Sequence, residues 1–380
     1  MELGRSMQRP APRITAIGKA PPRLFENCIH QEPLPIEIVE EGVIPGIHGS
    51  APGRFYAGVY RRDGLCCDAS LAMRAESPLD AYPYQTITAL SPRRSGAQAL
   101  YAGLLTPHFG HFLLEGTSRL WLALRDGFQG TIVFDSHDAR HLELPYVKRF
   151  LSLTGLWDRT IVATGPLQFE KVYVPYPAFR LATEIHPEFL RPFARAFSSL
   201  NVQARANRLR PLYLSRSKLS GGVIIGETTL EQSLEKEGFR IIYPELLPLK
   251  RQIILAAEAN LVAGIQGSAL HNVLFAPEPK RMLHLCREGR IRNFVMIDQV
   301  MGNEAQYVMG IAREIRPVFN AATPHLLDVE RAFDVLEELG ILRRKHRPAV
   351  DAKALMSDYL SEWEKQWAMH EKRQQRRAQS

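Results

Sequence analysis

The feature that most constrains the fold is a regular alternation of apolar runs with segments of helical periodicity, which begins near residue 98. In the first half the predicted strands are AQALYAGLL, TIVFDSH, RTIVAT and KVYVPYP, and the predicted helices are LPYVKRFLSLTGL and residues 187–206. A second series follows, with strands at LYLSR, FRIIYPE, NLVAGI and RMLHLC. Strands that alternate with helices predict mainly parallel sheets covered on both faces. The sequence therefore predicts an α/β protein with two consecutive Rossmann-like domains that face a cleft.

A polar, basic segment, ARANRLRP, separates the two series and marks the expected domain boundary. Residues 25–205 are predicted to form an N-terminal α/β domain, which begins with short β-like runs and a hairpin turn at RRDG. Residues 206–320 are predicted to form the C-terminal α/β domain. Residues 1–24 are expected to form a flexible basic arm, and residues 321–380 to form C-terminal helices and a basic tail.

Composition excludes several classes of protein. The chain has 380 residues, of which 45% are hydrophobic and 23% charged, as in ordinary globular proteins. It contains no apolar run long enough to span a membrane, and its basic N-terminus lacks the apolar core of a secretory signal. Its four cysteines form no Cys-x-x-Cys motif, so neither a zinc ribbon nor a redox motif is expected. Their scarcity indicates a reducing compartment.

The formal net charge is +8, and part of the excess lies near the two ends of the chain. Basic ends suit contact with an anionic membrane surface or an acidic polymer, whereas the alternative is a solvated tail without a partner. Aromatic residues are not interleaved with the basic runs, so nucleic-acid binding is not expected.

Residues 261–275, LVAGIQGSALHNVLF, are predicted to be a buried strand, a tight turn and a helix that begins at Gly267 and Ser268. Free backbone N–H groups and the positive end of the helix dipole attract phosphate at such a position. Ser268, His271 and Asn272 are spaced so that their side chains share one face of an α-helix. The stretch therefore predicts a cradle for the diphosphate of an activated donor, although most turns of this kind bind nothing.

A second candidate site lies at the end of the predicted strand 212–216, in the sequence SRSK. In open α/β sheets, ligands bind beyond the carboxyl ends of the strands. There Arg216 offers a bidentate fork to phosphate and Lys218 offers a point charge. The alternative is a surface loop with two ordinary charges.

Residues 106–126 are predicted to form an amphipathic helix, capped by Thr106 and followed by a proline at its first position. Its polar stripe could supply a general base to an acceptor hydroxyl, because the first turn of a helix favours the neutral imidazole that a base needs. Either His111 or Glu115 fits that role, and the alternative is a plain helix with its polar face in water. The predicted polar stripe contains His108, His111, Glu115, Ser118 and Arg119, and the predicted buried face contains Phe109, Leu113, Leu120 and Leu124.

Several motifs are absent from the sequence. There is no Walker-type phosphate loop, no Gly-x-Ser-x-Gly elbow and no Gly-x-Gly-x-x-Gly fingerprint after a strand. Their absence argues against NTPases, α/β-hydrolases and enzymes that use NAD or FAD. There is also no Asp-x-Asp pair, which sugar transferases that hold their donor through Mg²⁺ or Mn²⁺ commonly need. Basic groups and a helix start could neutralise a diphosphate leaving group without a metal.

Four segments together resemble glycosyltransferase family 61. They are HFGHFLLEGTSRLW (108–121), LYLSRSK (212–218), the YPE that follows GFRII, and AGIQGSALHNVLFAP (263–277). The family includes bacterial transferases of the capsular-polysaccharide type and plant β-1,2-xylosyltransferases. The resemblance covers roughly residues 95–300, with the segments in order and at sensible spacing. It implies a two-domain fold of the GT-B type, inversion at the anomeric carbon, a nucleoside-diphosphate-sugar donor, with a UDP-sugar favoured, and no cofactor or metal.

The resemblance also bears on individual residues. The family often has Gly-Pro-His-Gly where this chain has GIQG at residues 264–267, and Gln266 carries no charge and cannot act as an acid or a base. Position by position, Arg216, Ser268, His271 and Asn272 fall in the donor half, and His111 and Glu115 fall in the acceptor half. With the features above, the expected donor-binding residues are Arg216, Lys218, Gln266, Gly267, Ser268, His271 and Asn272, the expected catalytic residues are His111 and Glu115, and His108 and Arg119 are expected on the acceptor side.

We therefore expect an inverting, metal-independent glycosyltransferase that moves a sugar from a nucleoside-diphosphate-sugar to a hydroxyl of a glycan or polysaccharide acceptor. The C-terminal domain would hold the donor diphosphate, the N-terminal domain would present the base, and domain closure would align them. The expected location is the cytoplasm, with peripheral contact at the inner face of the membrane left open. The alternatives are a catalytically silent nucleotide-sugar-binding protein and a scaffold protein of a polysaccharide assembly system.

Overall fold

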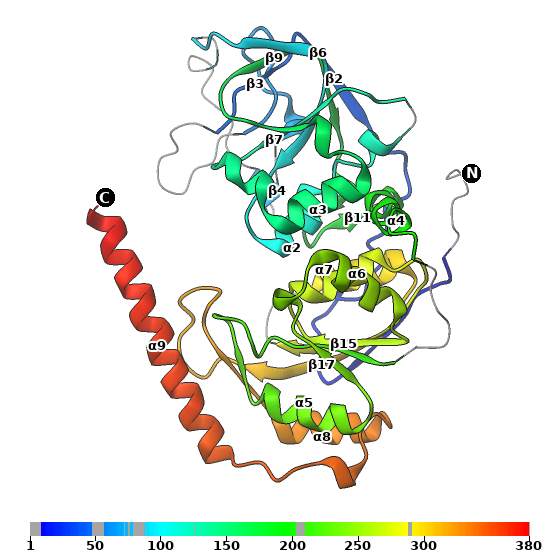
Figure 1. Ribbon diagram of the computed structural model, residues 1–380, viewed down its shortest axis with the longest axis vertical. Coiled ribbons are helices and arrows are strands. Elements are labelled where there is room, and N and C mark those ends of the chain that lie inside the picture. Colours follow the sequence, from blue (N-terminus) through cyan, green and yellow to red (C-terminus); the bar gives the residue numbers. More distant parts are fainter. Residues whose placement is uncertain are drawn as a thin grey trace. The chain divides into compact units, whose positions relative to one another are not determined.

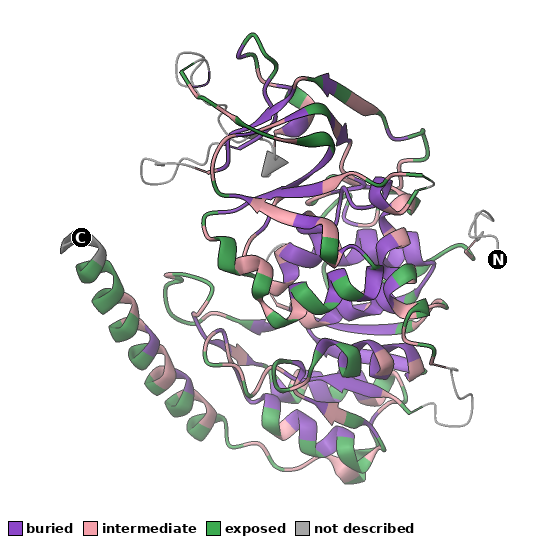
Figure 2. Cartoon of the chain, turned by 45° about the horizontal axis from the view of Figure 1, so that its top comes forward, coloured by how far each residue is buried: buried purple, intermediate pink, exposed green. Residues whose placement is uncertain are grey.

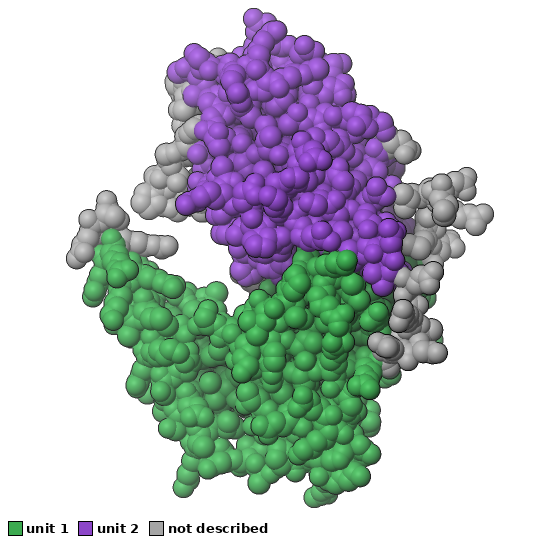
Figure 3. Space-filling view, viewed as in Figure 1, with its two compact units in different colours: residues 1–26, 204–273, 278–380 green, residues 27–203, 274–277 purple. Residues whose placement is uncertain are grey.

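The chain forms two compact units, each of which combines segments that are distant in sequence. The computed structural model describes residues 9–47, 57–71, 73–74, 77–78, 87, 89–125, 127–202, 210–287 and 291–379. The first unit comprises Met1–Glu26, Ala204–Val273 and Glu278–Ser380, and the second comprises Asn27–Gln203 and Leu274–Pro277 (Figure 3). Each unit is a mixed α/β structure with its own parallel sheet (Figure 1).

The first unit is built on a sheet of order β13-β18-β17-β16-β15-β12-β14, with β1 beside β17. Among the described strands, β17 and β18 pair antiparallel and the other neighbours pair parallel. Parallel strands end at a common edge, so the segments after β12, β15 and β16 emerge together. The strands are β1 (Arg13–Ile17), β12 (Leu212–Leu214), β13 (Ile224–Ile225), β14 (Arg240–Ile242), β15 (Leu261–Ile265), β16 (Arg281–Arg287), β17 (Glu304–Arg313) and β18 (His325–Leu327).

Helices cover both faces of this sheet, which explains why its central strands are almost continuously apolar and buried (Figure 2). Helices α6 and α7 lie on one face, and α5 and α8 on the other (Figure 1). In the described part of the chain, no helix combines the length and the apolarity needed to cross a bilayer. The helices are α5 (Glu227–Lys236), α6 (Leu249–Glu258), α7 (Arg292–Met301), α8 (Val329–Glu338) and α9 (Ala352–Gln379).

The prediction of a flexible arm over residues 1–24 is wrong for Arg13–Ile17, which form strand β1. Strand β1 pairs in parallel with β17, in register from Arg13 opposite Glu304 to Ile17 opposite Val308. The short run RITAI alternates polar and apolar residues, and this strand pattern is easily hidden by the basic composition around it. The first eight residues of the expected arm lie outside the described residues.

The sequence Thr228-x-x-Glu231 matches the pattern of a helix capping box, but the structure does not use it as one. Helix α5 begins after Gly226, which has a φ of 95° and offers no side-chain cap. Glu231 instead accepts hydrogen bonds from Ser215 Oγ at 2.6 Å and from Tyr243 OH at 3.0 Å. Its carboxyl group is therefore used to join the helix to the ends of two strands.

The second unit carries a sheet of order β2-β9-β6-β7-β8, with β3 beside β9. Strands β6, β7, β8 and β9 run parallel, and β2 and β3 run antiparallel to β9. The predicted hairpin turn at RRDG is confirmed, since Gly64 N donates to Arg61 O at 2.9 Å. The strands are β2 (Ile36–Glu40), β3 (Val43–Ile44), β4 (Met73–Arg74), β5 (Ser77–Pro78), β6 (Arg93–Leu104), β7 (Thr131–Asp135), β8 (Thr160–Ala163), β9 (Leu167–Pro175), β10 (Phe179–Arg180) and β11 (Glu184–Ile185).

Two helices of the second unit share an aromatic core. Helix α3 (Pro145–Thr154) ends at Gly155, which has a φ of 75°. Helix α4 (Arg191–Ser198) follows a 3-10 turn and is shorter than the predicted helix over residues 187–206, whose last residues lie outside the described ones. The rings of Phe150, Phe193 and Phe275 pack with centroids 5.1 to 5.9 Å apart.

The regular helix predicted over residues 106–126 is wrong. His108 caps the segment in place of Thr106, because its Nδ1 accepts a hydrogen bond from the backbone three residues on, at 3.3 Å. The Oγ1 of Thr117 donates to Leu113 O at 2.7 Å, a bond that favours bending of a helix. Asp126 lies outside the described residues. The segment consists of α2 (Phe109–His111), a π-turn over Phe112–Gly116 and a 3-10 turn over Leu122–Leu124.

Candidate functional site

Three neighbouring parallel strands of the first unit end in residues that could bind an anion. Arg216 lies two residues beyond β12, Gly267 lies two residues beyond β15, and Arg287 is the last residue of β16. Since β12 pairs with β15 and β15 with β16, the three residues emerge at the same edge of the sheet. Ligands of open α/β sheets bind at this edge.

Arg216 is held close to the β15 turn. Its backbone N–H donates to the carboxyl oxygens of Glu227 at 3.1 and 3.2 Å, and its Nη2 donates to Gly222 O at 3.1 Å. A Cβ built on Gly267 would lie 2.1 Å from Nη1, so the guanidinium packs directly against the glycine. The Nε of Arg216 is buried and makes no hydrogen bond to a described residue. The side chain is thus held in place while its buried Nε donor is unused.

Arg287 is a candidate residue that the sequence prediction missed. Its backbone N–H donates to Gln266 Oε1 at 3.1 Å, and its Nη1 lies 3.4 Å from His325 Nε2. Its Nε is buried and has no hydrogen-bond partner in the described part of the chain. Burial, together with the positive charge of Arg216, lowers the pKa of Arg287 to about 10, so the side chain stays charged at neutral pH. Its place at the end of a predicted strand is the signal that could have found it.

Burial changes the protonation state of two groups beside the two arginines. Burial raises the pKa of Glu227 to about 8, so this carboxyl group is protonated at neutral pH. Burial and the charge of Arg287 lower the pKa of His325 to about 4, so its imidazole is neutral, although Glu314 lies 2.8 Å from it. Two further carboxyl groups lie near the guanidinium groups, that of Glu245 near Arg216 and that of Glu314 near Arg287. Over the described ranges, no three His, Cys, Asp or Glu side chains come together in a way that could hold a metal ion.

Two of the predicted donor residues do not join the arginine pair directly. Gln266 is buried, and through its Oε1 it positions the backbone of Arg287. Lys218 is exposed, and its Nζ lies 5.6 Å from the centre of the Tyr243 ring. That geometry is a cation–π contact with a neighbouring strand end.

The predicted common face of Ser268, His271 and Asn272 is wrong, because Ser268–Phe275 forms a 3-10 helix. In such a helix, residues three apart eclipse and the next one points a third of a turn away. Asn272 is buried and donates to Gln252 Oε1 at 2.9 Å, which ties the turn to α6. His271 is buried as well, whereas Ser268 is partly exposed at the helix start.

In the second unit, the π-turn brings His111 and Glu115 into direct contact. His111 Nδ1 hydrogen-bonds to Glu115 Oε2, and the two side chains are 41% and 20% exposed. The ring of His108 meets that of His111 edge-on, with centroids 5.0 Å apart. A carboxylate bonded to Nδ1 orients the imidazole and leaves Nε2 as the nitrogen that can take a proton. The geometry is that of a base with its orienting carboxylate.

Ser118 and Arg119 lie in the interior, so their place on the predicted polar stripe is wrong. Arg119 is 4% exposed, and its guanidinium donates to the carbonyl oxygens of Pro175 and Ala69. Ser118 is buried, and its Oγ donates to Glu115 O at 2.6 Å. The helical wheel fails here because the π-turn adds a residue to the turn and shifts every later side chain. Arg119 therefore holds together the loops around the turn.

A family comparison identifies the region that contains both candidate sites. Residues 109–283 match the sequence profile of the family described as glycosyltransferase 61. The matched range includes the His111–Glu115 turn and the ends of β12 and β15 with Arg216 and Gly267, and it stops just before Arg287. A search of curated proteins finds no match. This match assigns residues 109–283 to glycosyltransferase family 61 and supports a glycosyltransferase activity for the protein.

Proposed function

We propose that this protein is an inverting glycosyltransferase that transfers a sugar from a nucleoside-diphosphate-sugar to a hydroxyl of a glycan or polysaccharide acceptor, with a UDP-sugar as the first donor to test. The observation that carries the proposal is the pair of arginines, Arg216 and Arg287, at one sheet edge, each with a buried Nε that has no partner among the described residues. Buried polar groups are normally satisfied, so these donors favour an anionic ligand. Guanidinium groups match phosphate oxygens two at a time.

The leaving diphosphate would be bound by Arg216, Arg287 and the first turn of the 3-10 helix. Gly267 lets the guanidinium of Arg216 lie directly over this turn, because no Cβ intervenes. Negative charge develops on the diphosphate as the bond to the anomeric carbon breaks, and two fixed positive charges stabilise it at that moment. In this proposal no metal ion is required.

His111 would act as the general base, with Glu115 as the group that orients it. As the acceptor oxygen attacks the anomeric carbon opposite the diphosphate, Nε2 of His111 takes the hydroxyl proton, and Glu115 stabilises the imidazolium that forms. Attack from the face opposite the leaving group inverts the anomeric centre. The two sets of residues belong to different units. In this proposal the two units close around donor and acceptor, as in a fold of the GT-B type.

The C-terminal helix supports a peripheral place at an anionic membrane surface. The residues from Glu371 to Arg376 are all exposed, and Lys372, Arg373 and Arg376 among them are basic. Basic segments of this kind are attracted to anionic lipids. We therefore propose a cytoplasmic protein that contacts the inner face of the membrane through the end of α9.

The test of the proposed function uses the full chain, UDP and a panel of UDP-sugars. A ligand at about 100 times its Kd stabilises the fold by about 2.7 kcal/mol, so a bound donor raises the Tm measurably. Release of UDP from one UDP-sugar would then show turnover without knowledge of the acceptor. We expect Arg216→Ala to abolish both signals while the fold persists.

Arg240→Ala is the matched control, because Arg240 is exposed at the amino end of β14, the strand next to β12. It should keep both the Tm shift and the turnover of the wild type. Full turnover in Arg216→Ala would contradict the role of the arginine pair.

A further inference from the structure

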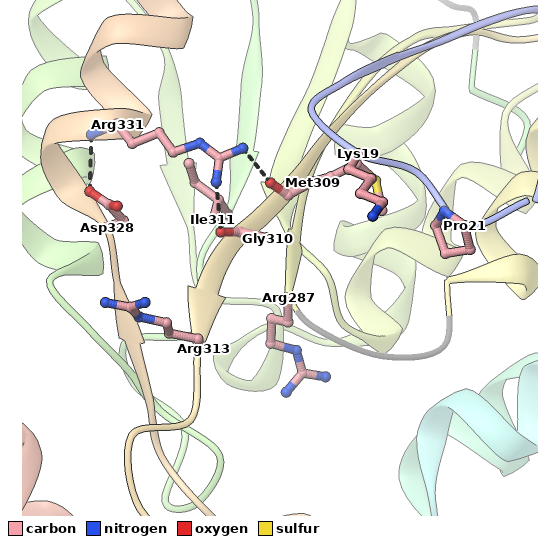
Figure 4. Close-up of a pocket in the computed structure, with 9 residues that line it drawn as sticks. All are labelled: Lys19, Pro21, Arg287, Met309, Gly310, Ile311, Arg313, Asp328 and Arg331. Carbon is pink, nitrogen blue, oxygen red and sulfur yellow. Dashed lines mark hydrogen bonds between the residues drawn. The ribbon is translucent and has the colours of Figure 1, made fainter.

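A second cationic cavity adjoins Arg287, at the edge of the sheet where β1, β16 and β17 end (Figure 4). Its volume is about 560 Å³, within the range of ligand-binding pockets. Lys19 reaches it from the segment after β1, and Arg313 from the end of β17. Every residue that lines the cavity belongs to the first unit.

The lining of this cavity carries a net positive charge. Four cationic side chains, Lys19, Arg287, Arg313 and Arg331, line it together with one carboxylate, Asp328. Four positive charges minus one negative charge leave a net charge of +3. Such a concave site concentrates field lines and attracts anions more strongly than scattered surface charges do.

The Asp328 carboxylate and Arg331 have structural bonds that leave this excess in place. Asp328 Oδ1 caps α8 by accepting a hydrogen bond from Arg331 N at 3.1 Å. The guanidinium of Arg331 donates to the carbonyl oxygens of Gly310 and Met309, at 3.1 and 2.7 Å (Figure 4). These carbonyl partners are neutral, so the charge of Arg331 is not compensated by them.

Lys19 and Arg313 are the cations available to a ligand. Both are exposed, and neither side chain forms a hydrogen bond or ion pair with another described residue. In Figure 4 they lie on opposite sides of Arg287, whose buried Nε also lacks a partner in the described part of the chain. Lys19, Arg287 and Arg313 thus line one cavity and offer their positive charges to a ligand with several negatively charged oxygens.

The remaining lining indicates the class of ligand. Apart from the charged residues, the cavity is lined by Pro21 and by residues 309–311 of β17, and no aromatic ring is among them. A nucleobase would find no aromatic ring to stack on there, whereas phosphoryl groups match the excess of positive charge. We propose that this cavity binds phosphoryl groups, as a second anion site beside the Arg216–Arg287 pair. The phosphoryl groups come either from the donor itself or from a separate phosphorylated ligand bound with it.

The site can be tested with inorganic pyrophosphate and calorimetry on the full chain at low ionic strength. The measurement is made in the Arg216→Ala variant, so that the proposed donor site contributes little. We expect pyrophosphate to bind, and the further changes Lys19→Ala and Arg313→Ala to weaken binding at least tenfold, because each removes a charge-assisted contact. Both side chains are exposed, so the fold should persist, and the Tm checks this.

The matched control replaces two other exposed arginines, Arg13 and Arg281, with alanine in the same background. Arg13 and Arg281 lie at the amino ends of β1 and β16, at the sheet edge opposite the cavity. Replacing both removes the same amount of charge as Lys19→Ala with Arg313→Ala. The Kd for pyrophosphate in this control variant should stay within about twofold of the value in Arg216→Ala alone. Added salt should weaken binding in both proteins. The proposal is overturned if pyrophosphate does not bind, or if the control pair weakens binding as much as Lys19→Ala with Arg313→Ala.

Repeating the titration of the wild-type protein with saturating UDP identifies the source of the phosphoryl groups, a step that rests on the proposed function. If a separate ligand occupies the cavity, pyrophosphate still binds to the UDP-loaded protein and Lys19→Ala with Arg313→Ala abolishes that binding. If the cavity serves the donor, UDP excludes pyrophosphate and the same two changes weaken UDP binding at least tenfold. Unchanged UDP binding in Arg216→Ala would instead defeat the proposed function and leave the cavity site standing.

Discussion

At the scale of single residues, the position of the Arg216 guanidinium in the proposed donor site depends on the absence of a side chain at Gly267. An alanine at position 267 would place its Cβ 2.1 Å from Nη1 and 3.1 Å from Cζ of Arg216, so the guanidinium must move. The end of a long side chain moves easily, and the Tm should change little. We expect Gly267→Ala to weaken UDP binding by about tenfold, since it displaces a charge-assisted donor worth about 1.5 kcal/mol or more. Calorimetry with UDP measures the change.

Gly165→Ala is the control for this substitution, because a Cβ there would meet nothing within 4 Å. It tests whether a glycine-to-alanine change affects UDP binding in general. Equal UDP affinity in Gly267→Ala and the wild type would show that the position of the guanidinium does not matter for the donor.

The buried carboxyl group of Glu227 predicts a pH dependence of stability. Its pKa is raised by burial from 4.5 to about 8 in the fold, so between these values the folded chain holds a proton that the unfolded chain has lost. The free energy of unfolding therefore falls as the pH rises through this window, with a slope of at most about 1.4 kcal/mol per pH unit from this group. Glu227→Gln keeps an oxygen that can accept from Tyr213 OH and Arg216 N, and it should flatten this slope.

Urea denaturation of the wild type and Glu227→Gln at pH 5, 6, 7 and 8 would measure this difference. Their stabilities should diverge in favour of the variant as the pH rises. Parallel pH profiles would mean that Glu227 ionises in the fold as it does in the unfolded chain.

The sequence identifies Arg216 and Gly267 but not Arg287, and the reason is physical. The first two stand where a strand gives way to polar or glycine-rich sequence, which is a local signal. Arg287 looks like a surface charge at the end of an apolar run. In the structure its Nη1 lies 3.4 Å from Nε2 of His325, a residue 38 positions away. Local patterns contain no information on such a distant contact.

At the scale of elements, the segment after β6 does not form the predicted regular helix, yet the predicted proximity of His111 and Glu115 is confirmed. His111 and Glu115 are four residues apart and meet in the π-turn, as they would in an α-helix. Beyond Gly116 the added residue of the π-turn changes the phase, so the prediction fails for Arg119. The side-chain bond of Thr117 to the backbone helps to break the regular geometry. Periodicity assumes a constant turn, and this segment has none.

A buried network of hydrogen bonds joins β16, α7 and β17. From it we predict how much the free energy of unfolding falls when the network is broken. Asp298 accepts hydrogen bonds from His284 Nε2 at 2.8 Å, from Tyr307 OH at 2.5 Å and from Asn303 Nδ2 at 2.7 Å. All four side chains are buried. Asp298→Ala would leave three buried donors without their acceptor, so we expect a loss of about 3 kcal/mol or more in the free energy of unfolding.

Chemical denaturation measures this loss, and Asp158→Ala is the control. Asp158 is exposed, and its removal should change stability by less than about 0.5 kcal/mol. Comparable stability of Asp298→Ala and Asp158→Ala would show that the buried network contributes no more stability than one exposed aspartate.

At the scale of the whole molecule, the alternation of strands and helices predicts the α/β class but not how the chain is shared between the units. Strand β1 comes from the N-terminal end and completes the sheet of the unit that is otherwise C-terminal. Residues 274–277 belong to the second unit, although their neighbours on both sides belong to the first. Both features depend on long-range pairing and packing, which a reading of local periodicity does not contain.

In α9, the residues that pack on the rest of the first unit precede the basic residues proposed to contact the membrane. Tyr359 is buried, and its hydroxyl accepts hydrogen bonds from Ile315 N and Arg316 N, both at 2.9 Å. Gln366 donates to Ser220 O at 2.9 Å. Truncation after His370 keeps these contacts, so the Tm and UDP release should stay as in the wild type. Binding to vesicles with anionic lipids, measured by co-sedimentation, should fall by about 100-fold or more, because each basic residue removed near the surface costs about 1 kcal/mol.

Vesicles of neutral lipid are the control for this truncation, since they should bind neither form. Equal binding of the full chain and the truncated chain to anionic vesicles would show that the C-terminal end of α9 does not contact the membrane.

The division of the proposed site between two units leads to a prediction about which kinetic step each residue controls. His111 and Glu115 lie in the second unit, and Arg216 and Arg287 in the first. If the first unit alone holds the donor, His111→Ala should bind UDP as the wild type does and should lose about 10²-fold to 10⁴-fold in kcat for transfer, as expected for a lost general base. Glu115→Gln should lose less, because the imidazole remains and only its orientation and charge stabilisation weaken. Arg216→Ala should act the other way and raise the KM for the donor.

The order of these losses separates a base from its orienting residue. A larger loss of kcat in Glu115→Gln than in His111→Ala would make Glu115 the base, since a carboxylate that takes the proton directly cannot be replaced by an amide. Wild-type kcat in both variants would place the base elsewhere. Weaker UDP binding in His111→Ala would mean that the second unit takes part in holding the donor, and the division of labour between the two units would then be wrong.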